Sequence, residues 1–310
     1  MMEAVSNSNR YPWEVTNQLR EKIGSMYNLT KDHVTIGAGS SELLGVVSLM
    51  ATLQKGNAVV PDPTFRLWVP AAKKTGLSIK LVPLTSGKIT DLQRMKDSID
   101  DNTKMLYICN PNNPTGTVLP AGELETFIKD ISPRCIILLD EAYTEFSNEP
   151  SMAKLVNDYP NLIVAKTFSK IYGMAGARVG FALAHPQTIK QMNELQSWPN
   201  AGASACAVAA ATATLDDTNF LTSTIAKNNV VKKLMYDFYK TNNIPYIESH
   251  ANFVYYSMDK YKGDLSNELE NRKILCGGIN EEKGKWYRVT VGTENEMKQY
   301  IKAVGELIQG

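Results

Sequence analysis

Short apolar runs alternate with amphipathic segments through the first two-thirds of the chain. The apolar runs predict strands at residues 34–36, 58–60, 78–82, 104–109, 135–139 and 162–166. The amphipathic segments between them predict helices at about residues 41–53, 67–75, 121–129 and 150–157. Short, almost uniformly apolar strands that alternate with helices are typical of a largely parallel sheet covered on both faces. We therefore expect an α/β fold in which ligands bind at the carboxyl ends of the strands.

The pattern changes near residue 216. A long amphipathic helix is expected at residues 221–242, strands at 253–256 and 286–291, and a last helix from Glu294. This mixture predicts a smaller α+β domain at the C-terminal end. The expected division is a large domain at residues 12–220 and a small domain at residues 221–310.

Charge and cysteine content narrow the range of partners. The 310 residues include 33 basic and 32 acidic ones, and the net charge of +1 gives no electrostatic reason to expect nucleic acid or an anionic membrane as a partner. No stretch approaches the roughly 20 apolar residues of a membrane span, and the polar start does not resemble a signal peptide. The scattered cysteines form no CxxC pair and predict reduced thiols rather than a metal site: Cys109, Cys135, Cys206 and Cys276. A cytoplasmic location is expected.

A lysine beside two hydroxyls follows one of the predicted strands. The segment at residues 167–180 places Lys170 next to Thr167 and Ser169, ahead of a glycine-rich loop and Arg178. This arrangement suits an amine close to a bound phosphate. Burial would lower the pKa of the amine and make it nucleophilic enough to form a Schiff base. A solvated loop lysine is the alternative interpretation.

A carboxylate follows the apolar run at residues 135–139. Asp140 begins the sequence Asp-Glu-Ala-Tyr, and a carboxylate at the end of a buried strand is costly unless it meets a cation or strong donors. The protonated ring nitrogen of a cofactor would be such a cation. Helix capping is the alternative role. Metal binding by Asp140 and Glu141 is less favoured, because adjacent strand residues point to opposite faces.

Gly39 and Ser40 lie where a predicted strand turns into a helix, whose N-terminus can bind an anion. The pair Gly37-x-Gly39 also begins a dinucleotide-binding fingerprint. However, Glu42 occupies the third glycine position, and Asp62, at the acidic position, lies inside a Pro-Asp-Pro turn. An anion site is therefore favoured over a nicotinamide site.

Two further segments present polar side chains. The loop at residues 109–116 contains two X-Pro turns and three asparagines, and Asn113 could donate to a phenolate oxygen on a bound ring. Arg288 stands in an otherwise apolar run and needs an anion nearby. That anion is either a structural carboxylate of the protein or the carboxylate of a substrate.

In this order, the motifs NNPTG, DEAY, SKxxGxxGxR and YRVTVGT resemble those of the fold-type I pyridoxal-5′-phosphate (PLP) enzymes. Among these, the chain is most similar to the class I/II aminotransferases, and within them to the histidinol-phosphate branch. Each motif alone is unspecific, but the combination is highly specific and the resemblance covers essentially the whole chain. It implies a PLP-binding large domain, whose mostly parallel sheet is sandwiched by helices, plus the smaller C-terminal domain.

The resemblance implies catalytic roles for three residues. Lys170 would form the Schiff base with PLP and move the proton between the substrate α-carbon and the cofactor. Asp140 would pair with the protonated ring nitrogen. Tyr143, together with Asn113, would donate to the phenolate oxygen of the ring.

The same resemblance implies the remaining contacts. Phe65 would stack on the cofactor ring, with Trp68 as the alternative, and Arg288 would bind the substrate carboxylate or its equivalent in histidinol phosphate. Tyr11 would reach the cofactor phosphate of the neighbouring subunit in a homodimer. The residues implied to hold the phosphate within one subunit are Gly39, Ser40, Thr167, Ser169 and Arg178.

The chain departs from the family pattern at two places. The N-terminal arm is expected to be shortened, to residues 1–11. Residues 274–278 read ILCGG where the histidinol-phosphate branch commonly has an arginine, which weakens the expectation of a phosphorylated substrate. The implied activity is transfer of an amino group from an amino acid or a histidinol-phosphate-like amine to a 2-oxo acid. A decarboxylase of the threonine-phosphate type and a non-catalytic PLP-binding protein are the alternatives.

Overall fold

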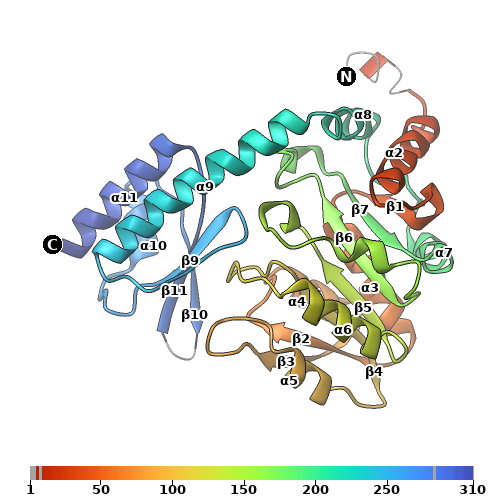
Figure 1. Ribbon diagram of the computed structural model, residues 1–310, viewed down its shortest axis with the longest axis horizontal. Coiled ribbons are helices and arrows are strands. Elements are labelled where there is room, and N and C mark those ends of the chain that lie inside the picture. Colours follow the sequence, from red (N-terminus) through yellow and green to blue (C-terminus); the bar gives the residue numbers. More distant parts are fainter. Residues whose placement is uncertain (1–4, 7–8, 282–283, 310) are drawn as a thin grey trace.

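Two β-sheets organise the molecule in the computed structural model, which describes residues 5–6, 9–281 and 284–309. The side chains of residues 279–281 and 284 lie outside this description. Among the residues described, the main sheet has seven strands and the second sheet has four. A long helix, α9 (Thr218–Thr241), runs from the neighbourhood of α8 to the second sheet (Figure 1).

The main sheet is almost entirely parallel. In spatial order its strands are β1 (Val34–Gly37), β7 (Gly180–Ala184), β6 (Leu162–Thr167), β5 (Ile136–Asp140), β4 (Thr103–Cys109), β2 (Asn57–Asp62) and β3 (Ser78–Pro83). Of these described strands, only β7 runs antiparallel to its neighbours. Most residues of the central strands are buried, as the apolar runs of the sequence require. The predicted α/β fold is confirmed.

Helices cover both faces of the main sheet. One layer packs on Ile137 and Val164 and consists of α2 (Trp13–Met26), α5 (Leu92–Asp97), α6 (Ala121–Ile131) and α8 (Ala205–Thr214). The other layer packs on Leu138 and Ile163 and consists of α3 (Ser40–Leu53), α4 (Trp68–Lys74) and α7 (Pro186–Leu195). Because side chains alternate across a strand, neighbouring residues of β5 and β6 enter different cores. Adjacent residues at the strand ends are therefore directed to opposite faces.

The second sheet is antiparallel. Its order is β10 (Gly277–Glu281), β11 (Gly284–Thr290), β9 (Phe253–Ser257) and β8 (Tyr246–Ile247). Helices α9, α10 (Leu265–Asn271) and α11 (Glu294–Gln309) share a core with it. The predicted smaller α+β unit is confirmed. Helix α9 begins at Thr218, so the predicted boundary between residues 220 and 221 falls in its first turn.

The prediction of a helix at residues 150–157 is wrong. Only a 3-10 turn, η3 (Met152–Leu155), forms there. Side chains cap the start of this turn: the Met152 amide donates to the Glu141 carboxylate at 2.8 Å, and the Ala153 amide donates to the Ser151 hydroxyl.

Strand β7 is absent from the predicted strands, because its apolar run follows a glycine-rich loop without a helix between. The remaining short elements are η1 (Lys31–His33), η2 (Thr144–Phe146) and η4 (Ala175–Ala177). None of the helices formed by the described residues is both long and apolar enough to cross a membrane.

Candidate active site

The carboxyl ends of three neighbouring strands bring the predicted polar segments together. Strands β4, β5 and β6 are adjacent, and Cys109 at the end of β4 is in register with Asp140 at the end of β5. The loops that follow these strands carry Asn113, Tyr143 and Lys170. The site thus lies at the edge where parallel sheets bind ligands.

Asp140 is a fully buried carboxylate, with 3% of its surface exposed. The Tyr107 hydroxyl donates to its Oδ2 at 2.9 Å, and the Ala142 amide donates to its Oδ1 at 3.2 Å. Burial raises the pKa of Asp140 to about 6, although both of these donors lower it. Within the described residues, no lysine or arginine forms an ion pair with this carboxylate. A cationic ligand would supply the missing charge.

Lys170 is half-buried, and its amine lies 5.2 Å from the centre of the Tyr143 ring. Burial lowers the pKa of this amine, and the nearby Arg288 guanidinium lowers it further, whereas Asp140 acts in the opposite direction. A lysine with a lowered pKa is more often neutral and is then nucleophilic.

Arg288 reaches from the second sheet to the loop after β4. Its Nη1 donates to Asn113 Oδ1 at 3.0 Å, and the guanidinium lies 5.1 Å from the centre of the Phe253 ring. Burial raises the pKa of Tyr143 well above its ordinary value, so its hydroxyl stays a donor. In the part of the chain that the structure describes, Arg288 pairs with an amide and not with a carboxylate. The cation is therefore available to an anionic ligand.

A group of donors surrounds the N-terminus of α3. Gly39 has a left-handed φ of 83°, and a Cβ there would lie 2.5 Å from the Arg178 guanidinium. Among the residues described, no side chain caps this end of α3, and the hydrogen bonds of the Arg178 side chain go to the backbone carbonyls of Ala175 and Ala38. Helix N-termini and guanidinium groups both bind anions. The hydroxyls of Ser40, Thr167 and Ser169 are the other donors predicted for this anion.

Thr167 is the last residue of β6 and accepts from the Ser169 amide at 3.1 Å. It is 5% exposed, whereas Ser169 is half-buried. In register, Thr167 faces Gly180 of β7, where a Cβ would clash with the backbone of Gly39 and Ser40. The structure thus brings the β6 end and the start of α3 together, as a shared phosphate site requires.

The aromatic candidates differ in exposure. The Trp68 indole stacks on Tyr107 with 4.0 Å between ring centres and donates to the Ser48 hydroxyl, so it belongs to the core. Phe65 is half-buried at the edge of the same core and remains the candidate for stacking on a bound ring. Tyr11 lies elsewhere: it is 62% exposed and stacks on Trp198 of its own chain at 4.8 Å.

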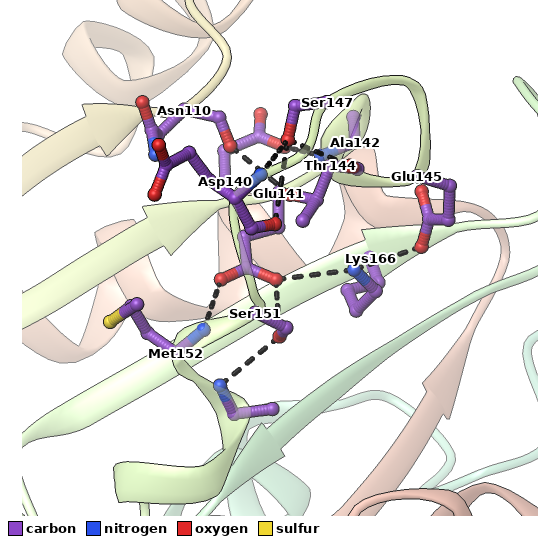
Figure 2. Close-up of polar contacts among 12 residues, drawn as sticks. Asn110, Asp140, Glu141, Ala142, Thr144, Glu145, Ser147, Ser151, Met152 and Lys166 are labelled. Atoms are coloured by element: carbon purple, nitrogen blue, oxygen red, sulfur yellow. Dashed lines mark hydrogen bonds and ion pairs between the residues drawn. The ribbon is translucent and has the colours of Figure 1, made fainter. Parts of the chain in front are cut away.

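The opposite face of β5 and β6 holds a buried ion-pair network (Figure 2). The Lys166 amine contacts Glu141 at 3.1 Å and Glu145 at 2.9 Å, and Glu141 also accepts from the Ser151 hydroxyl and the Met152 amide. These contacts occupy the Glu141 carboxylate, which points away from Asp140 as the strand alternation predicts. Among the described residues, no group of three His, Cys, Asp or Glu side chains could hold a metal ion.

Comparison with known proteins identifies the family to which the chain belongs. Residues 3–304 match the family described as aminotransferase class I and II. The chain belongs to the class I and II aminotransferases. This aminotransferase is 34% identical to histidinol-phosphate aminotransferase 2 of Carboxydothermus hydrogenoformans, over 99% of this chain and 85% of that protein.

Solved structures agree with the assignment. The aminotransferase is similar to a putative histidinol-phosphate aminotransferase from Erwinia carotovora atroseptica, with a TM-score of 0.92 and 28% identity over 99% of this chain and 90% of that one. It shares its fold with histidinol-phosphate aminotransferase from Sinorhizobium meliloti in complex with pyridoxal-5′-phosphate, with a TM-score of 0.91 and 24% identity over 99% and 85% of the two chains.

This aminotransferase uses PLP, and the described side chains fit the cofactor. PLP carries an anionic phosphate, a basic ring nitrogen and an aldehyde. The donors beside Gly39 and Arg178 suit the phosphate, because a Cβ at Gly39 would fill the space where the guanidinium lies. The buried Asp140 carboxylate, which has no cationic partner among the described residues, suits a protonated ring nitrogen. The Lys170 amine suits the aldehyde.

Two contacts that shape the site are absent from the sequence-based predictions. The first is the hydrogen bond from Tyr107 to Asp140, and the second is the pairing of Lys166 with Glu141. The signal for the first was the two-residue period of the strand, which puts Tyr107 on the same face as Cys109. Which tyrosine meets which carboxylate depends on the register between β4 and β5, and the sequence of one strand does not specify that register.

Proposed function

We propose that this aminotransferase takes the amino group of histidinol phosphate, or of a related amine or amino acid, and transfers it to a 2-oxo acid. The observation that carries the proposal is the placement of the Lys170 amine, lowered in pKa by burial and by Arg288, above the Tyr143 ring. A neutral amine can both attach to the cofactor aldehyde and accept a proton from a bound substrate. We assign both roles to Lys170.

Bound PLP supplies an electron sink for the charge that develops at the substrate α-carbon. We assign Asp140 to the ring nitrogen, since its buried carboxylate favours a protonated partner. Asn113 and Tyr143 are assigned to the phenolate oxygen, and the high pKa of Tyr143 keeps its hydroxyl a donor. We assign Phe65 to the face of the ring.

We assign the phosphate to the start of α3 and the end of β6. The ligands proposed are the Gly39 and Ser40 region, the hydroxyls of Thr167 and Ser169, and the Arg178 guanidinium. Arg178 has a backbone φ of 54° and no carboxylate partner in the described part of the chain, which supports its use for an anion. Fixing the phosphate would also fix the orientation of the ring above Asp140.

Arg288 is assigned to the anionic group of the substrate. Its hydrogen bond to Asn113 would position the guanidinium at the junction of the main and second sheets. Relatives that are histidinol-phosphate aminotransferases support histidinol phosphate as the leading donor. Residues 274–278 carry no arginine, and Gly277 lies opposite Arg288 in the second sheet. A donor without a phosphate is therefore the main competitor.

We further propose a homodimer of two-domain subunits, divided at residues 220 and 221, in which Tyr11 serves the phosphate of the partner. The exposed Tyr11, Trp13 and Trp198 rings form one cluster on the surface, in which Tyr11 stacks on Trp198 and Trp13 is tilted against both. Exposed aromatic clusters of this kind are typical of interfaces.

Two measurements test the function. Borohydride reduction of the holoenzyme should fix the cofactor to the peptide that contains Lys170, and Lys170→Ala should abolish both labelling and turnover. Labelling at Lys166 would overturn the assignment. Single amino donors should bleach the visible absorbance of the bound cofactor, and a 2-oxo acid should restore it. Release of carbon dioxide from threonine phosphate would instead identify a decarboxylase, and no response to any donor would identify a non-catalytic binding protein.

A further inference from the structure

Tyr107 lies beneath the proposed cofactor site and has no role in the assignments above. It is the fifth residue of β4, its side chain is 0% exposed, and its hydroxyl donates to Asp140 Oδ2 at 2.9 Å. A buried phenol donating to a buried carboxylate favours the charged form of the carboxylate. Tyr107 is thus placed to act on Asp140 without touching the cofactor.

A relay of buried contacts holds the Tyr107 ring in place. The ring stacks on Trp68 with 4.0 Å between centres and an interplanar angle of 14°. The Trp68 indole N–H donates to Ser48 Oγ at 3.2 Å, and Ser48 donates to the Leu44 carbonyl one turn earlier in α3. The position of the Tyr107 ring, and with it that of the hydroxyl oxygen, is therefore supported by residues of α3 and α4.

The two oxygens of Asp140 are held separately. Tyr107 holds Oδ2 and the Ala142 amide holds Oδ1, so the plane of the carboxylate is defined by β4 on one side and by the backbone after β5 on the other. The titratable groups around Asp140 are Tyr107 and Cys109 on β4, Lys170 after β6, and Glu141 and Tyr143 after β5. Burial raises the pKa of Tyr107 well above its ordinary value, so it remains a proton donor throughout the working range.

We propose that Tyr107 is a positioning residue, which keeps the Asp140 carboxylate ionised and oriented toward the ring nitrogen of the cofactor. The proposal rests on the assignment of Asp140 to that nitrogen. Without the Tyr107 hydroxyl, the Asp140 carboxylate would remain buried away from water but would lose one of its two hydrogen-bond donors. It would then take up a proton at a higher pH and lose its attraction for a protonated ring.

The variant Tyr107→Phe tests this, with Tyr239→Phe as the matched control. Tyr239 is also a fully buried phenol whose hydroxyl is hydrogen-bonded to another side chain, that of Tyr300 at 3.0 Å, but it lies in the core of the second sheet. Because each substitution removes one buried hydroxyl, any loss of stability that follows from this removal alone should appear in both variants. Thermal unfolding of the two apoproteins measures that shared effect.

The decisive readout is the dissociation constant of PLP, measured on the apoprotein between pH 5 and pH 9. Wild type should bind more weakly as the pH falls through about 6, where Asp140 takes up a proton. In Tyr107→Phe the weakening should begin roughly one pH unit higher, equivalent to about a tenfold loss of affinity at the intermediate pH. Tyr239→Phe should follow the wild-type profile. A Tyr107→Phe profile that superposes on wild type would overturn the proposal.

Asp140→Asn separates this proposal from the one on which it rests. In the Asp140→Asn background, adding Tyr107→Phe should leave the affinity for PLP and its pH dependence unchanged, because no carboxylate remains to respond. A further loss in that background would mean that Tyr107 acts through packing and would overturn the positioning role. If Asp140→Asn alone kept wild-type affinity and turnover, the assignment of Asp140 itself would fail.

Discussion

Lys166 and Lys170 lie four residues apart but differ in chemistry, because they emerge on different sides of the sheet end. Burial alone would lower the pKa of Lys166, but the carboxylates of Glu145 and Glu141 outweigh burial and hold it well above its usual value. Lys170 has no such ion pair among the described residues, and burial together with Arg288 lowers its pKa. The two-residue period of a strand would put residues four apart on the same face, so the period alone does not distinguish the two lysines. They differ because β6 ends at Thr167 and Lys170 lies in the loop that follows.

Arg288→Ala should raise the Michaelis constant for a carboxylate-bearing or phosphorylated donor by roughly tenfold to a hundredfold. A charge-assisted hydrogen bond is worth about 1.5–3 kcal/mol, and this one would be lost in the substrate complex. The affinity for PLP should change far less. Steady-state kinetics and cofactor titration give the two quantities.

Arg272→Ala is the control for that experiment, since Arg272 forms an exposed pair with Glu306. If Arg288→Ala loses PLP while substrate analogues still bind normally, the guanidinium is structural and its assignment to the substrate is wrong.

At the scale of elements, the buried network under β5 and β6 holds the segment after Asp140. Glu141 connects the end of β5 to Lys166 of β6 and to the first turn of η3. The segment that follows Asp140 is therefore held in place by the contacts of Glu141 with Lys166 and Met152 (Figure 2). A substitution in this network should therefore lower the stability of the protein more directly than it changes the catalytic residues.

Lys166→Met should destabilise the protein by about 3–5 kcal/mol, because two carboxylates then remain buried or partly buried without their cation. Lys154→Met is the matched control: it removes an exposed pair with Glu125, which is worth about 0–1 kcal/mol. Urea unfolding of both variants measures the difference. Equal stabilities would show that the buried network contributes no more than a surface pair.

Helix α9 contains a second buried lysine. The Lys232 amine donates to the Ser249 carbonyl at 2.7 Å, and burial lowers its pKa to about 8 from an ordinary value of 10.5. Between these two pH values the unfolded chain binds more protons than the folded one, so the free energy of unfolding rises with pH. The pH-dependent gain in the free energy of unfolding is absent below about pH 8 and complete above pH 10.5.

Lys232→Met removes the titrating group. The stability of wild type relative to the variant should therefore increase as the pH rises from 7 to about 10, a direction set by the lowered pKa. Urea unfolding at several pH values measures it. Lys233→Met, which removes an exposed pair with Asp237, should show no such trend. A difference that stays flat with pH would mean that Lys232 keeps an ordinary pKa in the folded protein.

The elements show which parts of the fold were predictable. Central strands such as β5 are buried on both faces, so their sequence is apolar throughout and marks them clearly. Strand β7 is equally apolar and buried, but it follows a glycine-rich loop with no helix before it, so the alternation of strands and helices does not indicate it. The short turn η3 is held in part by the Glu141 carboxylate, a contact that the local sequence pattern does not specify. The site residues were predictable as motifs after strands. The hydrogen bond between Tyr107 and Asp140 was not, because it depends on the register of two strands.

At the scale of the whole molecule, the main and second sheets meet at the contact between Arg288 and Asn113. The exposed aromatic cluster of Tyr11, Trp13 and Trp198 includes the first residue of α2, and α2 lies on the other side of the main sheet from the second sheet (Figure 1). Within one subunit the Tyr11 ring stacks on Trp198 and lies 5.9 Å from the Trp13 ring, centre to centre. The proposed homodimer would give this cluster a partner surface.

Subunit mixing tests whether sites are shared. Tyr11→Phe should first be shown to be strongly impaired, and Lys170→Ala inactive. If Tyr11 serves the partner's cofactor, a mixed dimer of the two variants has one site with both lesions and one with neither, so activity should reappear. If Tyr11 serves its own site, every site keeps one lesion. Mixed dimers that form but recover no activity would contradict the shared-site arrangement.

The pairing of β1 with β7 bears on the order in which the strands of the main sheet can pair as the chain is synthesised. Val34 is in register with Leu183, and β7 separates β1 from β6, so the N-terminal strand has no neighbour until residues 180–184 have been made. Strands β2 to β6 pair with one another over shorter separations and can assemble earlier. We therefore expect β1 to join the sheet after β2 to β6 have paired, because the pairing of β1 with β7 closes a longer loop than those pairings do.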